Sequence, residues 1–271
     1  MILRVPSRIL HLIIFLIGSK MIAIAGYGFV GKAYYEVFKN CFELEIVDPA
    51  IKKLRITDIE NLEAVVCCVG TPPAEDGSCS GKHVFEVIED TPKNVPILIK
   101  STISLEIWRE IQEKYPNRKI AFSPEFLRAA LAVQDLSNSD MMIVSGSEVE
   151  YWRKFYKKRF PKAKIHLYSP DEAIMIKYFR NSFLATKVSF FNQVYDLCEK
   201  LNLDYNCVRQ GVCDDFRIGH SHSFVDPTTA RGWGGMCFPK DTSALLEMSK
   251  LANVDLSLIQ QAVDYNKKIR K

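Results

Sequence analysis

A glycine-rich turn, Gly-Tyr-Gly-Phe-Val-Gly at residues 26–31, is the feature that most constrains the fold of this chain. It follows the apolar run Ile22–Ala25 directly and opens a helix expected over Lys32–Lys39. Glycines at this spacing allow a tight turn and a close approach of the backbone to a pyrophosphate. A second apolar run, Leu44–Val47, completes the order strand, turn, helix, strand. The sequence therefore predicts a dinucleotide-binding unit that begins at Met21.

Asp48 ends the second expected strand, 22 residues after the first glycine of the turn. A carboxylate at this place accepts hydrogen bonds from the hydroxyls of an adenosine ribose and repels a 2′-phosphate, which predicts NAD rather than NADP. Three nearby cations weaken this preference, namely Lys52, Lys53 and Arg55. The alternative interpretation is an ordinary turn aspartate before Pro49.

Short apolar runs recur between amphipathic stretches as far as Ser145, and we expect each to be a strand. The runs are Ile22–Ala25, Leu44–Val47, Ala64–Val69, Ile97–Ile99, Lys119–Phe122 and Met141–Val144. Continuous apolar character is typical of strands that helices cover on both faces. The pattern predicts an α/β fold with a Rossmann-type, doubly wound parallel sheet of about six strands.

A helix-start pattern follows the expected sheet, with Ser169 at the cap, Pro170 at the first helical position and Glu172 at the third. No Pro or Gly interrupts residues 171–202, so we expect one long helix there, with wide apolar coverage. Further helices are expected over residues 242–271. These features predict an NAD-binding domain over residues 21–168 and a helical central or dimerisation domain over residues 169–271. The broad apolar coverage of the long helix predicts a homodimer.

The first twenty residues resemble a signal peptide, because Arg4 and Arg8 precede the apolar run Ile9–Ile17. That run is too short to span a membrane, and the expected first strand follows at once. We therefore expect Met21 to be the natural start. On this interpretation residues 1–20 are an extension outside the fold, and the protein does not enter a membrane.

Composition excludes some partners and compartments. The formal net charge is only +4, and 36 basic residues are dispersed among 32 acidic ones, so nucleic acid is not an expected partner.

Eight cysteines show no C-x-x-C pair and no spacing typical of a disulfide or zinc framework. Reduced thiols in a cytoplasmic protein are the better interpretation. Adjacent Cys67 and Cys68 lie in an apolar run and are expected to be buried.

Six segments carry a resemblance to a known family. They are GYGFVG at 26–31, VGTPP at 69–73, KST at 100–102, SPEFLR at 123–128, KYFRNSFLATKVSFFNQ at 177–193 and GWGGMCFPKD at 232–241. Together they resemble the UDP-glucose/GDP-mannose dehydrogenase family, in order from Met21 to about Lys271. The family's third part, a C-terminal domain that holds the nucleotide of the sugar substrate, has no counterpart in this sequence.

The resemblance implies an NAD-dependent nucleotide-sugar 6-dehydrogenase, with UDP-glucose as the first substrate to consider. Family members oxidise a sugar primary alcohol twice with two NAD, through an aldehyde and a cysteine thioester that water hydrolyses to a uronic acid. The first hydride transfer needs a base and a group that stabilises an alkoxide, and the second needs a covalent thiohemiacetal. Cys237 is the implied nucleophile, since it follows glycines that let a sugar approach the backbone. The alternative is a buried cysteine in a glycine-rich turn.

The remaining catalytic roles are also implied by the resemblance. Lys177 and Asn181 lie four residues apart, so on a helix they project from one face and can reach one substrate oxygen. The family assigns them to the alkoxide and the tetrahedral intermediates, with Asp241 and Thr102 holding water or Lys177. Glu125 matches the carboxylate that acts as general base in thioester hydrolysis. Without the resemblance, these residues would be assigned to a solvated helix face and a surface loop.

Further positions are matched to ligand contacts only. Cofactor contacts are expected from Gly26, Tyr27, Gly28, Phe29, Val30, Gly31, Asp48, Lys53, Thr71, Thr102 and Lys240. Substrate contacts are expected from Glu125, Phe126, Leu127, Lys177, Asn181, Asp226, Ala230 and Gly234, and from Arg217, which resembles an arginine that crosses a dimer interface. His220 and His222 have a spacing that can ligate a metal but lack a third ligand in pattern, and we expect no metal.

The chain departs from the family at Ala129, where a second glutamate usually contacts the cofactor. Three possibilities stay open for the missing third part: a compact variant, an enzyme completed by a separate polypeptide, or a chain that binds NAD and turns over poorly. A rival enzyme class is a single-step sugar or hydroxy-acid dehydrogenase, which shares the fold plan and needs no cysteine. A cofactor-binding or partner subunit without activity is the non-enzymatic alternative.

Overall fold

The computed structural model describes residues 20–72, 79–228 and 231–270. The expected extension at residues 1–20 therefore lies, except for Lys20, outside the described residues. The described chain forms two compact units. The first comprises residues up to Ile174 without Cys79, and the second comprises Cys79 and the residues from Met175 onward.

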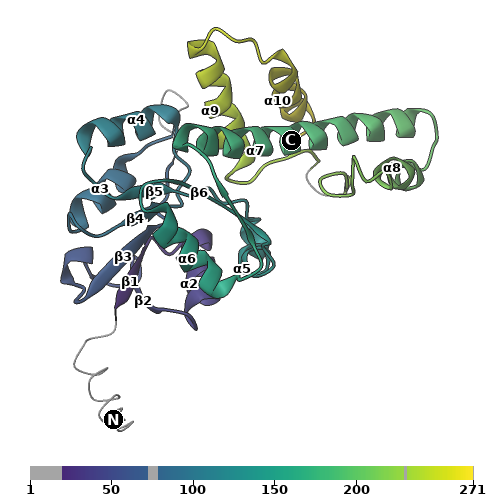
Figure 1. The fold of residues 1–271 in the computed structure, drawn as a ribbon. Helices are drawn as coiled ribbons and strands as arrows, with labels where there is room; N and C mark the ends of the chain where they lie inside the picture. Colours follow the sequence, from purple (N-terminus) through teal and green to yellow (C-terminus); the bar gives the residue numbers. More distant parts are fainter. Residues whose placement is uncertain (1–19, 73–78, 229–230, 271) are drawn as a thin grey trace, which may run out of the picture. The chain divides into compact units, whose positions relative to one another are not determined.

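The first unit is built on a mostly parallel sheet, which confirms the predicted fold class (Figure 1). Its strands are β1 (Met21–Ala25), β2 (Glu43–Val47), β3 (Leu62–Cys67), β4 (Ile97–Ile99), β5 (Ile120–Phe122), β6 (Met141–Gly146) and β7 (Lys164–Leu167). They lie in the order β2-β1-β3-β4-β5-β6-β7. All six expected strands are present.

Two features of the sheet differ from the prediction. Strand β7 was not expected, because Lys164 and His166 alternate with its apolar residues and no side chain in it is fully buried. Strand β6 pairs antiparallel with β5, whereas every other pair is parallel. A connection long enough to cross a sheet can also bring the chain back to the same end, so an alternation of strands and helices does not fix strand direction.

Helices cover both faces of this sheet (Figure 1). On one face lie α2 (Phe29–Phe38), α5 (Ala132–Ser137) and α6 (Val149–Arg159), which pack against Ile22, Ile24 and Val144 in one apolar cluster. On the other face lie α3 (Lys82–Asp90) and α4 (Leu105–Lys114). Two short 3₁₀ helices, η1 (Ile56–Asp58) and η2 (Ala129–Leu131), complete the unit. Helix α2 begins three residues earlier than expected, inside the glycine turn.

The long helix α7 spans Pro170–Lys200 and ends two residues before the predicted end. Its start is the expected capping box: the Glu172 carboxylate accepts a hydrogen bond of 2.8 Å from the Ser169 backbone N–H, and the Ser169 hydroxyl accepts one of 3.3 Å from the Glu172 N–H. The compact units divide within this helix, between Ile174 and Met175.

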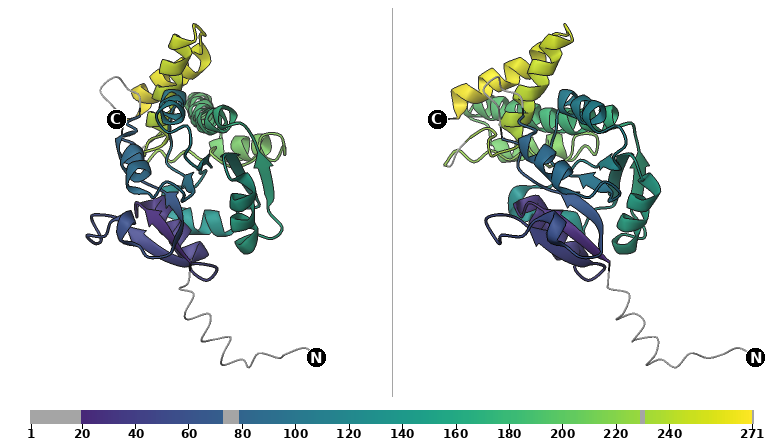
Figure 2. Two further views of the ribbon diagram at one scale, coloured as in Figure 1. Left: turned by 60° about the vertical axis from the view of Figure 1, so that its left-hand side comes forward. Right: turned by 90° about the vertical axis from the view of Figure 1, so that its left-hand side faces the viewer.

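The second unit contains the rest of α7 with α8 (Tyr205–Cys213), α9 (Phe238–Leu251) and α10 (Ser257–Ile269). One apolar cluster joins the C-terminal half of α7 to α8 through Phe191, Cys198, Tyr205 and Cys213. Helices α9 and α10 lie side by side (Figure 2). No helix in the described part of the chain is long and apolar enough to cross a membrane.

Candidate active site

The glycine turn has the geometry that its sequence predicts. Gly26 has φ +88°, and a Cβ atom there would lie 2.8 Å from the backbone of Val69. A Cβ atom on Gly31 would lie 2.0 Å from the carbonyl oxygen of Gly26. At Gly28, by contrast, a Cβ atom would meet nothing within 4 Å. Two of the glycines therefore allow close packing of the turn, and the third leaves open space beside the N-terminus of α2.

This turn lies where the strand order reverses. Strand β1 is bordered by β2 on one side and β3 on the other, so the loops that follow β1 and β3 leave the sheet at a topological switch point. Ligands of doubly wound sheets bind in the crevice at that point. Thr71 follows β3, and its hydroxyl donates a hydrogen bond of 2.8 Å to the carbonyl oxygen of Thr102. The structure thus brings together two residues that were expected to contact the cofactor.

Asp48 fixes the conformation of the turn. Its carboxylate accepts hydrogen bonds from the backbone N–H of Tyr27, at 2.7 Å, and from the backbone N–H of Ala50, at 2.9 Å. Each carboxylate oxygen can accept a further bond, so the same group remains able to receive a ribose hydroxyl. The expected cofactor residue Lys53 lies exposed in the segment after this strand.

The residues of the first unit fit a dinucleotide. Helix α2 has no side-chain cap at Gly28, so the N–H groups of its first turn are available to an anion. A pyrophosphate suits that position because the helix dipole and the N–H groups both favour negative charge. Phe29 and Val30 belong to this first turn and pack against the core. A bound NAD would accept hydride at this site.

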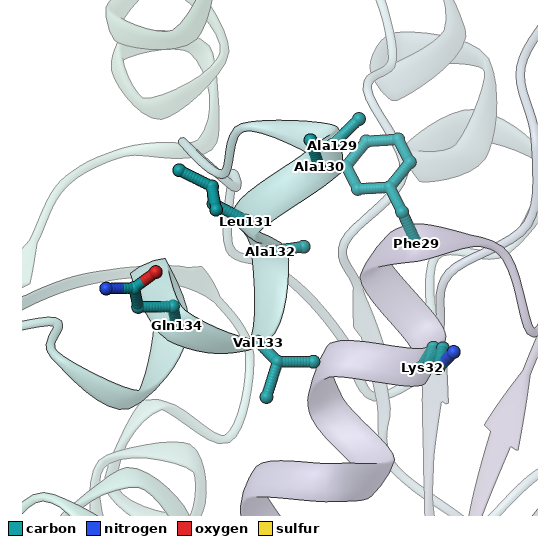
Figure 3. A pocket seen from close by; sticks show the side chains of 8 residues that line it. All are labelled: Phe29, Lys32, Ala129, Ala130, Leu131, Ala132, Val133 and Gln134. Carbon is teal, nitrogen blue, oxygen red and sulfur yellow. The ribbon is translucent and has the colours of Figure 1, made fainter.

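A pocket of about 460 Å³ opens beside the same helix terminus (Figure 3). Phe29 and Lys32 of α2 line one side, and residues 129–134 of η2 and α5 line the other. Ala129, the position at which the family usually has glutamate, is part of this lining. The missing carboxylate therefore leaves an apolar wall opposite an exposed lysine.

Glu125 follows β5 and is buried, not at the surface as its alternative interpretation assumed. Its carboxylate forms an ion pair of 2.5 Å with Lys100 and accepts a hydrogen bond from the hydroxyl of Tyr34. Phe126 and Leu127 are half-buried. A buried carboxylate held by two donors has a fixed position, which a general base requires.

In the second unit, three expected site residues form one cluster. Asn181 donates a hydrogen bond of 2.6 Å to the carboxylate of Asp241, and Lys240 forms an ion pair of 2.8 Å with the other oxygen. Lys177 lies one turn before Asn181 on α7, and both side chains are buried, not solvated. Lys240 was expected to contact the cofactor, whereas in this structure its partner is Asp241.

Cys237 is the N-cap residue of α9 and is half-buried. It lies at the N-terminus of the helix, and its side chain accepts no capping hydrogen bond from the first turn. Its carbonyl oxygen accepts a hydrogen bond of 2.9 Å from the N–H of Asp241. The cysteine and the cluster around Asn181 and Asp241 are therefore joined by one helical turn.

The glycine-rich loop before Cys237 is anchored by buried side chains. Asn266 accepts a hydrogen bond of 2.8 Å from the N–H of Trp233 and donates one of 2.9 Å to its carbonyl oxygen. The indole N–H of Trp233 donates a hydrogen bond of 2.9 Å to Ser189 on α7. At Gly232 a Cβ atom would lie 2.3 Å from Asn266, which explains the glycine.

The remaining expected substrate residues are less constrained. Arg217 forms a salt bridge with Asp215 in an exposed loop, and Asp226 accepts hydrogen bonds from Thr228. The side chain of Arg270 lies against Gly234. Ala230 lies outside the described residues. His220 pairs with Asp214 at 3.1 Å, and the described residues contain no group of three or more potential metal ligands.

All eight cysteines lie in the described part of the chain and are free thiols. Cys67 and Cys68 are buried, as expected, and burial raises the pKa of Cys67 to about 11. The side chains that hold the expected site residues in place were not predicted from the sequence. These are Tyr34, Lys100, Tyr156, Ser189, Trp233 and Asn266. KST and GWGGMCFPKD contain Lys100 and Trp233, so their place in those motifs was the available signal.

Comparisons with known proteins agree with both units. A model of the NAD-binding domain of the UDP-glucose/GDP-mannose dehydrogenase family matches residues 45–159, and a model of its central domain matches residues 171–268. A UDP-glucose 6-dehydrogenase of Rickettsia felis is 33% identical over 222 residues, which cover 78% of this chain and 49% of the relative. The YwqF UDP-glucose 6-dehydrogenase of Bacillus subtilis is 32% identical, over 75% of this chain and 48% of its own length. The chain thus spans about half the length of these relatives.

Solved structures share the fold. A UDP-glucose dehydrogenase from Pyrobaculum islandicum has a TM-score of 0.76 and 24% identity, over 93% of this chain and 68% of its own. A 3-hydroxyisobutyrate dehydrogenase from Mycobacterium tuberculosis has a TM-score of 0.72 and 16% identity, over 93% of this chain and 94% of its own. At these identities the likeness concerns the fold alone.

Proposed function

Because this chain belongs to the UDP-glucose/GDP-mannose dehydrogenase family, we propose that it is an NAD-dependent nucleotide-sugar 6-dehydrogenase that works through a thioester on Cys237. The observation that carries the proposal is the cluster in which the buried Asp241 binds both Asn181 and Lys240, one helical turn from the N-cap cysteine of α9. A buried amide and a half-buried ammonium held on one buried carboxylate are arranged to stabilise charge that develops on a substrate oxygen.

The proposed chemistry uses four electrons for each sugar. In the first oxidation the C6 alcohol loses a proton to a base and a hydride to NAD, which leaves an aldehyde. The sulfur of Cys237 then adds to the aldehyde carbon, and Lys177 and Asn181 stabilise the oxygen of the resulting thiohemiacetal. Transfer of a second hydride to a second NAD, with loss of the hydroxyl proton to a base, would give the thioester. Water attacks that carbon and the C–S bond breaks. Cys237 departs as a thiolate, and the product is a uronic acid.

Glu125 is the proposed base for the hydrolytic step. Its ion pair with Lys100 keeps the side chain in one place, and a general base must lie within hydrogen-bond reach of the water that it activates. Thr102, whose carbonyl oxygen is held by Thr71, is proposed to position water or Lys177.

NAD is the cofactor of the family domain that residues 45–159 match. Asp48, held on the glycine turn by the N–H of Tyr27, would select it over NADP by accepting the ribose hydroxyls. The first substrate to test is UDP-glucose, on which the relatives named above act. We propose that the chain either acts on a substrate with a shorter group for the protein to bind, or relies on a separate polypeptide to recognise the nucleotide.

A homodimer through α7 is part of the proposal. Phe179, Phe183, Phe190 and Leu197 are at least half exposed and are spaced by four or seven residues, so they form one apolar stripe along the helix. An exposed stripe of this kind is typical of a helix–helix interface. Arg217, in an exposed loop, is proposed to reach the neighbouring subunit's substrate. The free thiols support a cytoplasmic location.

The decisive experiment measures NADH and uronic acid from UDP-glucose, UDP-N-acetyl sugars and GDP-mannose, with the chain alone and with candidate partner chains. We expect two NADH for each sugar, and trapping of an aldehyde or hemithioacetal in Cys237→Ser. Full acid production by Cys237→Ala would refute the thioester.

A single-step dehydrogenase is the second candidate. The fold is compatible with it, because a 3-hydroxyisobutyrate dehydrogenase shares the fold over nearly its whole length and one fold supports more than one chemistry. Such an enzyme would yield one NADH for each substrate and would be insensitive to alkylation of Cys237. A chain that binds NAD but oxidises none of the tested sugars would instead be a partner subunit.

A further inference from the structure

Lys100 is a buried cation that takes no step of its own in the proposed chemistry. It follows β4, and its side chain is only 1% exposed. Its three N–H donors all have acceptors: the carboxylate of Glu125 at 2.5 Å, the hydroxyl of Ser123 at 2.7 Å and the hydroxyl of Tyr156 at 3.0 Å. An ammonium has three donors and no acceptor, so each of its N–H groups finds a partner in this set. A buried charge needs a counter-charge, and the Glu125 carboxylate lies at ion-pair distance from Nζ.

Two tyrosines close the contacts of Lys100 into a ring. Tyr34 on α2 donates a hydrogen bond to Glu125, and its hydroxyl lies 2.9 Å from that of Tyr156 on α6. The Tyr156 hydroxyl lies 2.9 Å from Ser123. The ring therefore comprises Lys100, Ser123, Tyr156, Tyr34 and Glu125. The ion pair between Glu125 and Lys100 closes it. Each of them is buried.

Counting protons fixes the direction of every bond in this ring. An ionised carboxylate only accepts, so the single proton of Tyr34 is committed to Glu125. Tyr156 must then donate to Tyr34, and Ser123 must donate to Tyr156 while accepting from Lys100. The bonds run one way, from the ammonium to the carboxylate, and bonds that run in sequence strengthen one another.

The charges of the neighbouring groups agree with this direction. Burial lowers the pKa of Lys100, but the Glu125 carboxylate and Tyr156 outweigh burial and raise it. Burial and Glu125 raise the pKa of Tyr34 well above its usual value, so Tyr34 keeps the proton that it donates. The aromatic ring of Tyr34 stacks on Phe38 at 5.4 Å and thereby holds the hydroxyl in place.

We propose that Lys100 and Tyr34 are positioning residues for Glu125, which hold its side chain as a carboxylate and fix one of its oxygens. The role of Glu125 as base rests on the proposed function, whereas the fixed carboxylate rests on the ring alone. The two residues act through Glu125 and touch no substrate. Their loss would slow the hydrolytic step and spare the first oxidation.

The kinetic test compares Tyr34→Phe with wild type. The variant removes one hydroxyl and keeps the ring that packs on Phe38. With UDP-glucose we expect thioester hydrolysis to slow on the order of tenfold, a part of the 10²–10⁴-fold that a placed base supplies. The first hydride transfer and the KM for sugar should stay unchanged, and intact-mass spectrometry should find the acyl group accumulating on Cys237. Unchanged hydrolysis would overturn the proposal.

Tyr115→Phe is the matched control. Tyr115 also donates a hydrogen bond to a glutamate, Glu89, at 2.6 Å, but that pair is exposed on the surface. Its loss should change neither step. Equal slowing in both variants would mean that a general loss of stability, rather than the ring, is responsible, and would also overturn the proposal.

A second measurement does not depend on activity. The Nζ of Lys100 is followed by ¹⁵N NMR in wild type and in Glu125→Gln, and we expect the variant to lose its ammonium proton at a lower pH. Identical titration of Lys100 in the two proteins would overturn the fixed ion pair. A wild-type chain that oxidises no sugar would contradict the proposed function, and the Lys100 titration would then decide the ring by itself.

Discussion

Asn181 and Asp241 lie 60 residues apart in the sequence and share a hydrogen bond of 2.6 Å between the amide of one and the carboxylate of the other. Because Asp241 is 1% exposed and also pairs with Lys240, it links α7 to the first turn of α9. The bond therefore connects the proposed oxyanion residue to the segment that carries Cys237.

Asp241→Asn should lower both stability and activity. The substitution keeps the volume but leaves Lys240 without its counter-charge, and hydrogen bonds to charged groups contribute about 1.5–3 kcal/mol. We expect the free energy of unfolding in urea to fall by about that amount. Asp255→Asn, at an exposed position, is the control and should leave it unchanged. Equal stability of the Asp241 variant would show that the cluster does not hold the two helices together.

Local patterns in the sequence predicted the parts of the fold that local interactions determine. The glycine turn, the capping box at Ser169 and the long helix each depend on residues within a few positions of one another. Apolar runs marked six strands because strands covered on both faces carry few polar residues. Strand β7 was missed because its polar residues alternate with apolar ones and it is only partly buried.

The supports of the candidate site could not be predicted in the same way. Lys100 and Glu125 lie in the loops after β4 and β5, and Tyr34 and Tyr156 lie on α2 and α6, so only folding brings the four together. Taken singly, Lys100 and Glu125 look like surface charges, since charged residues are rarely buried unless paired. The pairing of Asn266 with Trp233 is equally long-range. The motifs named the residues proposed to react, whereas the partners that fix them follow from tertiary structure.

Gly31→Ala should abolish NAD binding and destabilise the first unit. The added Cβ atom would lie 2.0 Å from the carbonyl oxygen of Gly26, so the glycine turn would have to move. Gly211→Ala is the matched control, because Gly211 is also in a helix and a Cβ atom there meets nothing within 4 Å. That control should be neutral or raise stability by about 0.5–1 kcal/mol. Calorimetric titration with NAD and thermal unfolding measure both effects, and normal NAD affinity in Gly31→Ala would contradict the proposed cofactor site.

Ala129→Glu should strengthen NAD binding. The new carboxylate would lie in the pocket lined by Phe29 and Lys32, where family members carry a glutamate that contacts the cofactor. One added hydrogen bond contributes about 0.5–1.5 kcal/mol, so we expect the Kd to fall by about 2- to 10-fold. Ala129→Gln, which adds the same length without charge, should have a smaller effect. Weaker NAD binding in Ala129→Glu would contradict the prediction that a carboxylate at this position contacts NAD favourably.

The rate of alkylation should differ between cysteines according to their burial and hydrogen bonds. Burial raises the pKa of Cys67 to about 11 and that of Cys68 well above its usual value, so at neutral pH both stay protonated, and the thiol is not the nucleophile. The hydrogen bond from Cys207 to Asp204 raises the pKa of Cys207, which should slow its reaction as well. Iodoacetamide at neutral pH should therefore modify the two half-buried cysteines, Cys41 and Cys237, before Cys67 and Cys68, as peptide mapping can establish. Modification of Cys67 before Cys237 would show that the first unit opens readily.

Phe183→Glu should convert a dimer into a monomer. Phe183 is 68% exposed in the middle of the apolar stripe on α7, and in a two-fold dimer the substitution appears in both copies. Burying a phenylalanine contributes about 1.5–3 kcal/mol, so loss of two should weaken association by about 100-fold or more. Leu258→Glu is the control, because Leu258 is 73% exposed but lies on α10, away from the stripe. Sedimentation velocity distinguishes the outcomes. A wild-type monomer would refute the dimer, and a dimer that survives Phe183→Glu but dissociates with Leu258→Glu would place the interface elsewhere than on the α7 stripe.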